Sequence, residues 1–384
     1  MVLTRMRVGL DGYPLCERLT GVGHYTFELA RALARTYTSC QFELIAPFQF
    51  DVSVLAQIQR EQLSNLKLIN LNLSSVRGRW WSLHLPRYIK RAALDLFHGT
   101  NYELPLWNRR CTVVTVHDLS SLCYPELHRK QLARRMRVRL PLTVKLAKAI
   151  ITPTAAVKQE LCTELKVKPA KVTAIHEAPR ESFSPVSREA AVRVRKRLGV
   201  EDDFLLFVGT LEPRKNLGTL LKAFAQMIRE TPLRPQLVVA GGAGWLMDET
   251  FVIMQDPDIR ERLCLTGYLH DDDLRALYSS CRAFIYPSLY EGFGLPPLEA
   301  MATGAPVIAS RAAALLETLG EAAILVDPLD VQGLSQAMVA LLAAETRRAE
   351  LIEKGRTQAA KFSWRRTAEL TYDVYQRCVS AGRA

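Results

Sequence analysis

Short apolar runs alternate with helix-like segments along the whole chain. Most runs are four or five residues long, rich in Val, Ile, Leu and Phe, and continuous, as in strands that are buried on both faces. Parallel strands need crossover connections, so the intervening helices are expected to cover both faces of each sheet. The predicted strands lie at residues 6–10, 42–46, 67–70, 94–97, 112–116, 149–152 and 172–175 in a first series, and at 204–208, 236–240, 262–266, 283–286, 306–309 and 322–326 in a second.

A polar interval at residues 177–200 separates the two strand series. Prolines, serines and charged residues interrupt the apolar periodicity there, which indicates a domain boundary. The pattern predicts an α/β protein of two doubly wound, Rossmann-like domains, residues 1–180 and 181–363, followed by a helical segment at 364–384.

Residues 287–310, PSLYEGFGLPPLEAMATGAPVIAS, place two carboxylates on either side of a turn rich in Gly and Pro. The stretch predicts strand, loop, short helix and strand. Paired prolines suit a first helical turn, where a missing N–H loses no partner, and Gly304 suits the helix end. Glu299 is expected within the opening turn of that helix, and Glu291 in the loop before it.

The N–H groups of Gly294 and Leu295 would then point outward at a positive helix end, where a phosphate is favoured. Ionised carboxylates beside such a site accept hydrogen bonds only, and sugar hydroxyls are suitable donors. The alternative is that Glu299 merely complements the helix dipole and Glu291 is a solvated loop charge. The glycine-rich turn, the double proline and the second carboxylate favour the binding site.

A second candidate site follows the strand at 204–208, in the segment G-T-L-E-P-R-K-N. Arg214 and Lys215 come just before a predicted helix, with Asn216 as its expected cap. Two cations at a helix N-terminus oppose the helix dipole unless an anion lies between them. We therefore expect them to bind a diphosphate, Arg214 with paired donors and Lys215 as a point charge. The alternative is a pair of solvated turn residues.

Two glycines and two histidines are the candidates in the first domain. Gly21 and Gly23 precede a helix predicted at 24–37 and would let the backbone approach a ligand closely. The rest of a dinucleotide fingerprint is missing, so no nicotinamide cofactor is expected. His98 and His117 each follow a predicted strand, where ligands gather in open α/β sheets. A histidine there is more often structural; His117, which Asp118 could orient, is the candidate, and His98 is treated as a loop residue.

Composition adds a strongly basic region to this picture. The chain has 384 residues, 48% of them hydrophobic, and a formal net charge of +12. Residues 127–159 contain nine Lys or Arg and no Asp or Glu. Such a region is attracted to anionic lipid headgroups, with an ordinary solvated helix face as the alternative. Nucleic acid is not expected as a partner, because no recognised binding motif accompanies the charge.

The eight cysteines are scattered without a C-x-x-C pair, which favours reduced residues over zinc ligands or a disulfide framework. Neither a bilayer-spanning apolar run nor a secretory leader is apparent. We expect a cytoplasmic protein, peripheral to the inner face of the membrane if the basic region binds lipid.

The stretch at 287–310 resembles the E-x7-E signature of retaining glycosyltransferases of family 4, which have the GT-B fold. The resemblance extends over roughly residues 6–377 and is densest in the second domain, where the segment at 209–216 also matches. It implies two domains facing across a cleft, a C-terminal helix that crosses back to the first domain, and catalysis without a metal or other cofactor. One departure is Leu316, where the family commonly has Pro before the following Glu317.

The resemblance also implies roles for individual residues. Arg214 and Lys215 match the phosphate-binding pair, and Gly21 and Gly23 match the loop that closes over the donor diphosphate. His117 matches the histidine directed at the donor sugar. The remaining matches are Glu291, Phe293, Gly294 and Leu295 at the donor sugar and diphosphate, Glu299 at the ribose hydroxyls, and Leu269 beside the nucleotide base.

The opening M-R-V-G-L-D-G-Y-P-L, followed by T-G-V-G-H-Y-T, resembles bacterial mannosyltransferases of surface-polysaccharide synthesis. We therefore expect a retaining, metal-independent glycosyltransferase that moves mannose from GDP-mannose to a hydroxyl of a glycan. A lipid-linked glycan, as in O-antigen synthesis, would suit the basic region. The alternatives are a GT-B sugar-nucleotide epimerase and a catalytically silent nucleotide-sugar-binding protein that assists a partner enzyme.

Overall fold

The parallel pairing expected from the strand pattern is present in both halves of the chain. The computed structural model describes residues 6–73, 79–105, 111–242 and 244–381. One sheet has seven strands in the order β3-β2-β1-β4-β5-β6-β7, and the other has six in the order β10-β9-β8-β11-β12-β13. Every strand pair is parallel. The first six strands of the first sheet and the whole second sheet share the 3-2-1-4-5-6 order of doubly wound folds.

Contacts divide the chain into two compact units. The first unit holds Met1–Leu122, Arg134–Glu177 and Ser363–Ala384, and the second holds Cys123–Ala133 and Ala178–Phe362. The first unit gives way to the second after Glu177, at the start of the predicted polar interval. The segment Cys123–Ala133 belongs with the second unit, although it precedes that interval.

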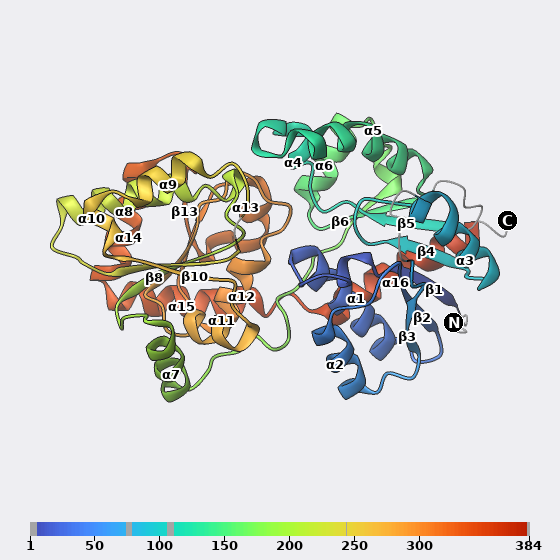
Figure 1. Ribbon diagram of the computed structural model, residues 1–384, viewed down its shortest axis with the longest axis horizontal. Helices are drawn as coiled ribbons and strands as arrows, with labels where there is room; N and C mark the ends of the chain where they lie inside the picture. The colour runs from blue at the N-terminus through green and yellow to red at the C-terminus, as the bar shows by residue number, and fades with distance from the viewer. Residues whose placement is uncertain (1–5, 74–78, 106–110, 243, 382–384) are drawn as a thin grey trace. The chain divides into compact units, whose positions relative to one another are not determined.

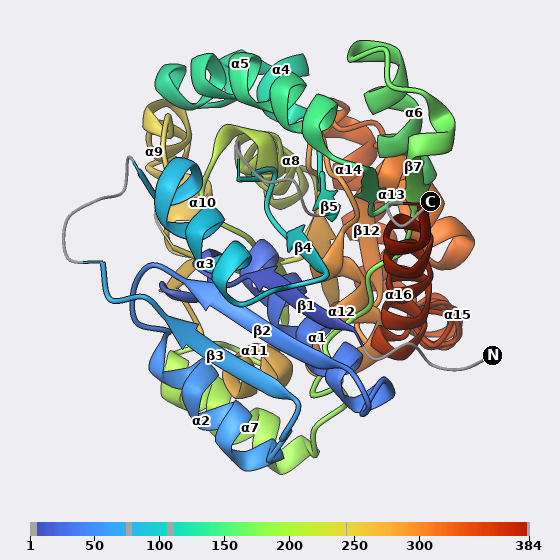
Figure 2. The ribbon, with the colours of Figure 1, turned by 90° about the vertical axis from the view of Figure 1, so that its right-hand side faces the viewer.

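The first half of the chain carries the first strand series and its crossover helices. The strands lie close to their predicted positions. Figures 1 and 2 show their arrangement in the sheet. The elements are β1 (Arg7–Asp11), α1 (Gly21–Thr36), β2 (Gln41–Ala46), α2 (Val52–Glu61), β3 (Leu66–Asn70), a π-helical turn (Trp80–His84), α3 (Leu85–Arg91), β4 (Leu96–Gly99), β5 (Cys111–Thr115), α4 (Ser120–Cys123), α5 (Lys130–Leu146), β6 (Ala149–Thr152), α6 (Ala155–Glu164) and β7 (Val172–Ala174).

The C-terminal helix α16 (Trp364–Ala381) returns to the first unit, as predicted. Figure 2 shows it beside the sheet of that unit. Tyr372 of α16 stacks on Tyr37 after α1 with 3.7 Å between ring centroids, and the Tyr375 hydroxyl lies 2.6 Å from His98 Nδ1. The helix is therefore part of the first unit's core.

The second unit repeats the architecture around its six strands. Figure 1 shows α8 and α14 on one face of the sheet and α11 and α12 on the other. Its elements are α7 (Arg188–Leu198), β8 (Phe204–Val208), α8 (Leu217–Glu230), β9 (Gln236–Ala240), α9 (Asp248–Met254), α10 (Pro257–Arg260), β10 (Leu263–Gly267), α11 (Asp271–Tyr278), β11 (Ala283–Tyr286), α12 (Leu295–Thr303), β12 (Val307–Ser310), α13 (Ala313–Leu319), β13 (Ile324–Val326), α14 (Val331–Ala343) and α15 (Glu345–Ala359).

Both faces of the second sheet are covered by apolar packing, which explains its continuous hydrophobic strands. In β8, Leu205 and Phe207 point into the core beneath α8 and α14, whereas Phe204 and Leu206 point into the opposite core beneath α11 and α12. All four are fully buried. Such a strand cannot alternate apolar and polar residues, because neither face meets water.

Candidate functional site

The second unit's site lies where its strand order reverses. Strands β8 and β11 are neighbours in the sheet, but the chain leaves them toward opposite faces. The loops after their carboxyl ends therefore open a crevice, which is the usual ligand position in open α/β sheets. The first loop carries Arg214 and Lys215, and the second carries Glu291.

A single 3-10 turn, Pro213–Lys215, shapes the loop after β8. It ends at Asn216, whose φ of 56° is left-handed, a conformation that Asn tolerates better than most residues. Asn216 is the N-cap of α8 in position, as predicted, but its side chain does not cap the helix. Its Nδ2 instead donates to the carbonyls of Pro287, at 2.9 Å, and Pro328, at 2.6 Å.

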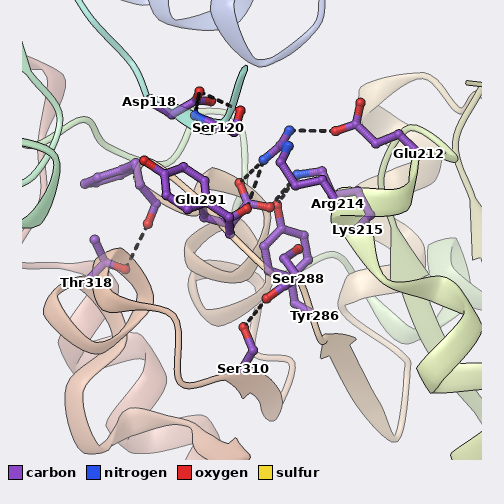
Figure 3. Close-up of polar contacts among 12 residues, drawn as sticks. Asp118, Ser120, Glu212, Arg214, Lys215, Tyr286, Ser288, Glu291, Ser310 and Thr318 are labelled. Carbon is purple, nitrogen blue, oxygen red and sulfur yellow. Dashed lines mark hydrogen bonds and ion pairs between the residues drawn. The ribbon is translucent and has the colours of Figure 1, made fainter. Parts of the chain in front are cut away.

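Arg214 and Lys215 converge on one carboxylate, that of Glu291 (Figure 3). Lys215 Nζ donates to Glu291 Oε1 at 2.6 Å and to the Tyr286 hydroxyl at 2.6 Å. Arg214 Nη1 donates to Glu291 Oε2 at 3.0 Å, and its Nη2 donates to Glu212 Oε1 at 2.7 Å. The structure thus joins residues of the two predicted candidate sites in one cluster.

Burial and charge set the protonation of this cluster. Burial pushes the pKa of Glu291 upward, but the charges of Lys215 and Arg214 outweigh it and hold that pKa at about 2. Burial lowers the pKa of Lys215 and raises that of Tyr286 well above its usual value. Glu291 is therefore an ionised acceptor at neutral pH and cannot supply a proton.

The loop after β11 is held at several points along its backbone. Leu289 N–H donates to the Arg214 carbonyl at 2.9 Å, which joins the two loops directly. Ser310 Oγ donates to the Ser288 carbonyl at 2.5 Å, and Thr318 Oγ1 donates to the Phe293 carbonyl at 3.0 Å. Figure 3 shows the bonds made by Ser310 and Thr318. A loop held in this way presents its carboxylate in one orientation.

Helix α12 begins at Leu295, after Gly294 in the N-cap position. Gly294 has a φ of +98°, which strains any other residue, and a Cβ there would lie 2.5 Å from Leu315 Cδ2, which would have to shift. Pro296 and Pro297 occupy the first turn and Gly304 ends the helix with a φ of +89°, as predicted. The two prolines carry no backbone N–H. Among the first three helical residues, Leu295 is therefore the one whose backbone amide can donate a hydrogen bond to a ligand.

Glu299 lies deeper in α12 than predicted. It is the fifth helical residue, in the second turn, because the helix starts at Leu295. Its carboxylate accepts two bonds from Arg180, with Nε to Oε1 at 2.6 Å and Nη2 to Oε2 at 2.9 Å. Glu299 is 3% exposed. The predicted ribose contact is thus a buried carboxylate with one edge already paired.

Sequence reasoning missed Arg180. It lies in the polar interval that served only as a boundary signal, 119 residues before its partner Glu299. Its guanidinium also donates to Asp271 Oδ1 at 2.6 Å and covers the Phe183 ring at 4.0 Å. In the sequence, Arg180 is marked only by its place after Pro179 and before Glu181 and Ser182. This pattern does not indicate a binding partner for Arg180.

The other predicted donor-binding residues of the second unit are Phe293 and Leu295, near the start of α12, and Leu269, after β10. Phe293 is buried, with its ring 5.8 Å from that of Phe362, so its backbone is the part that can face a ligand. Leu295 packs in part against the same core. Leu269 follows the edge strand β10 and packs against the core cluster beneath α11 and α12.

The first-unit glycines lie within a helix, not before it. Helix α1 begins at Gly21, three residues earlier than predicted, with Thr20 as its N-cap. A Cβ on Gly23 would lie 3.0 Å from the Pro14 carbonyl, whereas one on Gly21 would meet open space. The N–H groups of residues 21–23 therefore form a helix N-terminus, which suits the predicted diphosphate contact.

His117 follows β5 and is held by its own unit. Its Nε2 lies 2.8 Å from the Thr100 carbonyl, and its Nδ1 lies 3.2 Å from Glu177 Oε1. Asp118 does not orient the ring, because its Oδ1 accepts bonds from the amide and hydroxyl of Ser120. Glu177 has the orienting position, a residue that sequence reasoning missed.

His98 is a strand residue, which corrects its assignment to a loop. It lies in β4, is fully buried, and its Nε2 lies 2.8 Å from Thr115 Oγ1. Burial lowers the pKa of His98 to about 3, with a smaller contribution from His117. A neutral ring that is fully buried in its own unit's core is a structural histidine.

Other features fall outside the candidate site. Gly241 has a φ of +151°, and a Cβ there would overlap the Gly209 carbonyl. The glycine-rich loop after β9 therefore lets its backbone pack closely against the backbone of the loop after β8. Ala243 of this loop lies outside the described residues. A cavity of about 770 Å³ lies in the first unit between α6, β7 and Arg377, away from every predicted site residue. Within the described ranges, no three His, Cys, Asp or Glu residues gather as metal ligands.

Comparison with known proteins identifies the family. A model described as Glycosyltransferase Family 4 matches residues 19–178, and one described as Glycosyl transferases group 1 matches residues 190–358. The O-antigen chain mannosyltransferase B of Escherichia coli is 30% identical over 382 residues, 97% of this chain and 100% of that protein. The O-antigen chain mannosyltransferase RfbU of Salmonella typhimurium is 26% identical over 263 residues, 68% of this chain and 69% of that protein.

Solved structures share the fold at low sequence identity. Sucrose-phosphate synthase from Thermosynechococcus elongatus has a TM-score of 0.78 at 21% identity, over 98% of this chain and 100% of that one. HepE from Anabaena, solved with UDP and glucose, has a TM-score of 0.76 at 17% identity, over 97% of this chain and 100% of that one. The chain therefore belongs to glycosyltransferase family 4 and is a glycosyltransferase with the GT-B fold.

Proposed function

We propose that this enzyme transfers mannose from GDP-mannose to a hydroxyl of a lipid-linked glycan in O-antigen synthesis, with retention at the anomeric carbon. The observation that carries the proposal is the cluster of Arg214, Lys215 and Glu291 at the sheet's switch point. The sugar is proposed from the full-length similarity to the O-antigen chain mannosyltransferase B of Escherichia coli.

The cluster offers nitrogen donors to a leaving diphosphate. Lys215 Nζ has three N–H bonds, two of which reach Tyr286 and Glu291, so one is left for a phosphate oxygen. Arg214 adds a planar guanidinium and Leu295 a helix N-terminal amide. These groups stabilise the charge that develops as the bond to the sugar breaks, without a metal or other cofactor.

Glu291 supplies the complementary acceptor. Because its pKa is held at about 2, it remains ionised throughout the neutral range and accepts a hydrogen bond from a donor-sugar hydroxyl. Glu299 accepts from the ribose hydroxyls, and His117 of the first unit contributes to the donor-sugar side. The diphosphate leaves from the face that the acceptor hydroxyl attacks, which preserves the anomeric configuration.

A panel of GDP-, UDP-, dTDP- and ADP-sugars tests the proposal. Nucleotide release is measured with and without a lipid-linked glycan, and the anomeric configuration of the product is read by NMR. We expect acceptor-dependent release of GDP from GDP-mannose. Conversion of the donor without acceptor would instead indicate an epimerase, and binding without turnover a silent partner protein.

Arg214→Ala tests the cluster itself. Loss of a guanidinium that stabilises the leaving group is expected to reduce turnover about 100-fold or more and to weaken donor binding. Arg229→Ala is the matched control, because Arg229 forms ion pairs on the surface of the same unit. Wild-type turnover in Arg214→Ala would remove this residue from the site.

The basic region is proposed to hold the enzyme at an anionic membrane. Along α5, Arg134, Arg137 and Lys145 are exposed, and Val138 and Leu142 beside them are 72% and 42% exposed. A helix face that combines cations with exposed apolar side chains suits a lipid headgroup layer. No helix in the described part of the chain is long and apolar enough to span a membrane.

Sedimentation with vesicles tests this contact. We expect binding to phosphatidylglycerol vesicles that weakens with salt, and none to phosphatidylcholine. Val138→Asp should reduce binding, whereas Val252→Asp, which alters an equally exposed valine on α9, should not. Equal binding to both lipids, or no effect of Val138→Asp, would contradict the proposed surface.

A further inference from the structure

The short segment 177–180 supplies a buried partner to a predicted site residue in each unit. Glu177 is the last residue of the first unit's central segment, and Arg180 lies just inside the second unit. Both side chains are buried, at 4% and 7% exposure. Between them, Pro179 fixes its own φ and restricts Ala178, so the segment has few backbone conformations.

At its first end, Glu177 controls the His117 ring. The imidazole lies between two oxygen acceptors, Glu177 Oε1 and the Thr100 carbonyl. The Tyr25 and Tyr102 rings make T-shaped contacts with it, at centroid distances of 4.7 and 5.7 Å. A ring enclosed in this way is held in one orientation, with the Glu177 carboxylate against its Nδ1 edge.

At its other end, Arg180 controls the Glu299 carboxylate. A guanidinium that donates from Nε and Nη2 to both oxygens aligns the carboxylate plane with its own. Arg180 is itself fixed by Asp271 and by the Phe183 ring. A carboxylate has about four lone-pair directions, so pairing one edge leaves the other edge for paired hydroxyls.

We propose that Glu177 and Arg180 are positioning residues, Glu177 for His117 and Arg180 for Glu299, in the transfer reaction. The inference rests on the proposed function, because it takes the roles of His117 and Glu299 from there. Neither residue touches the donor. Arg180 presents the open edge of Glu299 to the ribose 2′- and 3′-hydroxyls, and Glu177 holds the His117 ring in one orientation.

Nucleotide binding separates a positioning role of Arg180 from a structural one. The affinities of GDP and UDP, each against its 2′-deoxy form, are measured by calorimetry for the wild type and for Arg180→Lys. Lysine keeps the charge but cannot donate from two fixed positions. We expect the wild type to lose about tenfold in affinity for the 2′-deoxy form, and Arg180→Lys to lose less than about threefold.

Arg195→Lys is the matched control, since Arg195 is a buried arginine of the same unit that pairs with Asp202. It should keep the wild-type ratio between the two forms. An unchanged ratio in Arg180→Lys, with folded protein and measurable GDP binding, would overturn the inference alone. If the wild type binds neither GDP nor UDP, the proposed donor class fails and the inference fails with it.

Steady-state kinetics test Glu177. In Glu177→Gln the side chain keeps its shape but loses its charge, so kcat should fall about tenfold while the donor KM changes less than about twofold. Glu43→Gln, which changes a buried glutamate paired with Arg7 in the same unit, should leave both constants unchanged. A wild-type kcat in Glu177→Gln, or an equal loss in Glu43→Gln, would overturn the role of Glu177.

Discussion

Lys215 Nζ lies 2.6 Å from Glu291 Oε1, although 76 residues separate the two in the chain. This buried ion pair gives the site a property that its separate motifs do not show. The cation predicted to bind phosphate and the carboxylate predicted to bind sugar hold each other in place before any donor arrives. Each therefore serves the orientation of the other as well as the substrate.

Removing one member of this pair should affect stability and activity differently from removing both. Lys215→Met leaves Glu291 buried with one cation fewer, which costs roughly 3–5 kcal/mol for a broken buried pair. Adding Glu291→Gln removes the buried negative charge that has lost one of its two cations, so the double variant should regain much of the lost melting temperature. Its transfer activity should stay about 100-fold or more below wild type. Melting curves and nucleotide-release rates check both parts, and recovered activity in the double variant would contradict the assigned roles.

Asn216 should matter through the carbonyls that it joins. Asn216→Asp replaces a donor with a charge that faces the Pro287 and Pro328 carbonyls. An unsatisfied buried group costs about 1–3 kcal/mol. We expect a lower melting temperature and a kcat/KM reduced about tenfold, since the loop that carries Glu291 loses its anchor at Pro287. Lys222→Ala, at an exposed position of α8, should change neither quantity.

Gly294 should tolerate no side chain. Gly294→Ala places a Cβ 2.5 Å from Leu315 Cδ2 in a backbone with a φ of +98°. The left-handed conformation alone costs roughly 1 kcal/mol for alanine, and the overlap adds to it. Gly199→Ala separates the two costs, because Gly199 has a φ of +70° and a Cβ there would meet nothing within 4 Å. Chemical denaturation should show a larger loss for Gly294→Ala, and equal losses would mean that Leu315 moves aside freely.

Asp11 should make the first unit less stable as pH rises. Burial raises the pKa of this carboxyl from 3.8 to about 8, against the opposing hydrogen bond from the Tyr13 amide. The folded protein then binds more protons than the unfolded chain between these values, so stability falls as pH rises through that range. Asp11→Asn removes the titration. Its melting temperature relative to wild type should rise between about pH 5 and pH 8.5, and a constant difference would contradict the raised pKa.

Every predicted strand of the chain is present, and most bounds agree within two residues. The continuous apolar runs made this possible, because strands buried on both faces stand out from the helices between them. The errors concern local ends. Helix α1 begins at Gly21, before its predicted start at residue 24. His98 belongs to β4, because pairing with β5 extends that strand beyond its predicted apolar run at 94–97.

The sequence by itself determined the strand and helix order, the two Rossmann-like units and the motif residues Arg214, Lys215 and Glu291, because these follow from local periodicity and residue spacing. Only the tertiary structure decided the partners of Glu299 and His117. Asp118 does not serve its neighbour, because its carboxylate turns to the amide and hydroxyl of Ser120. The groups that do, Arg180 and Glu177, lie 119 and 60 residues away, and only the packed sheets bring them into contact.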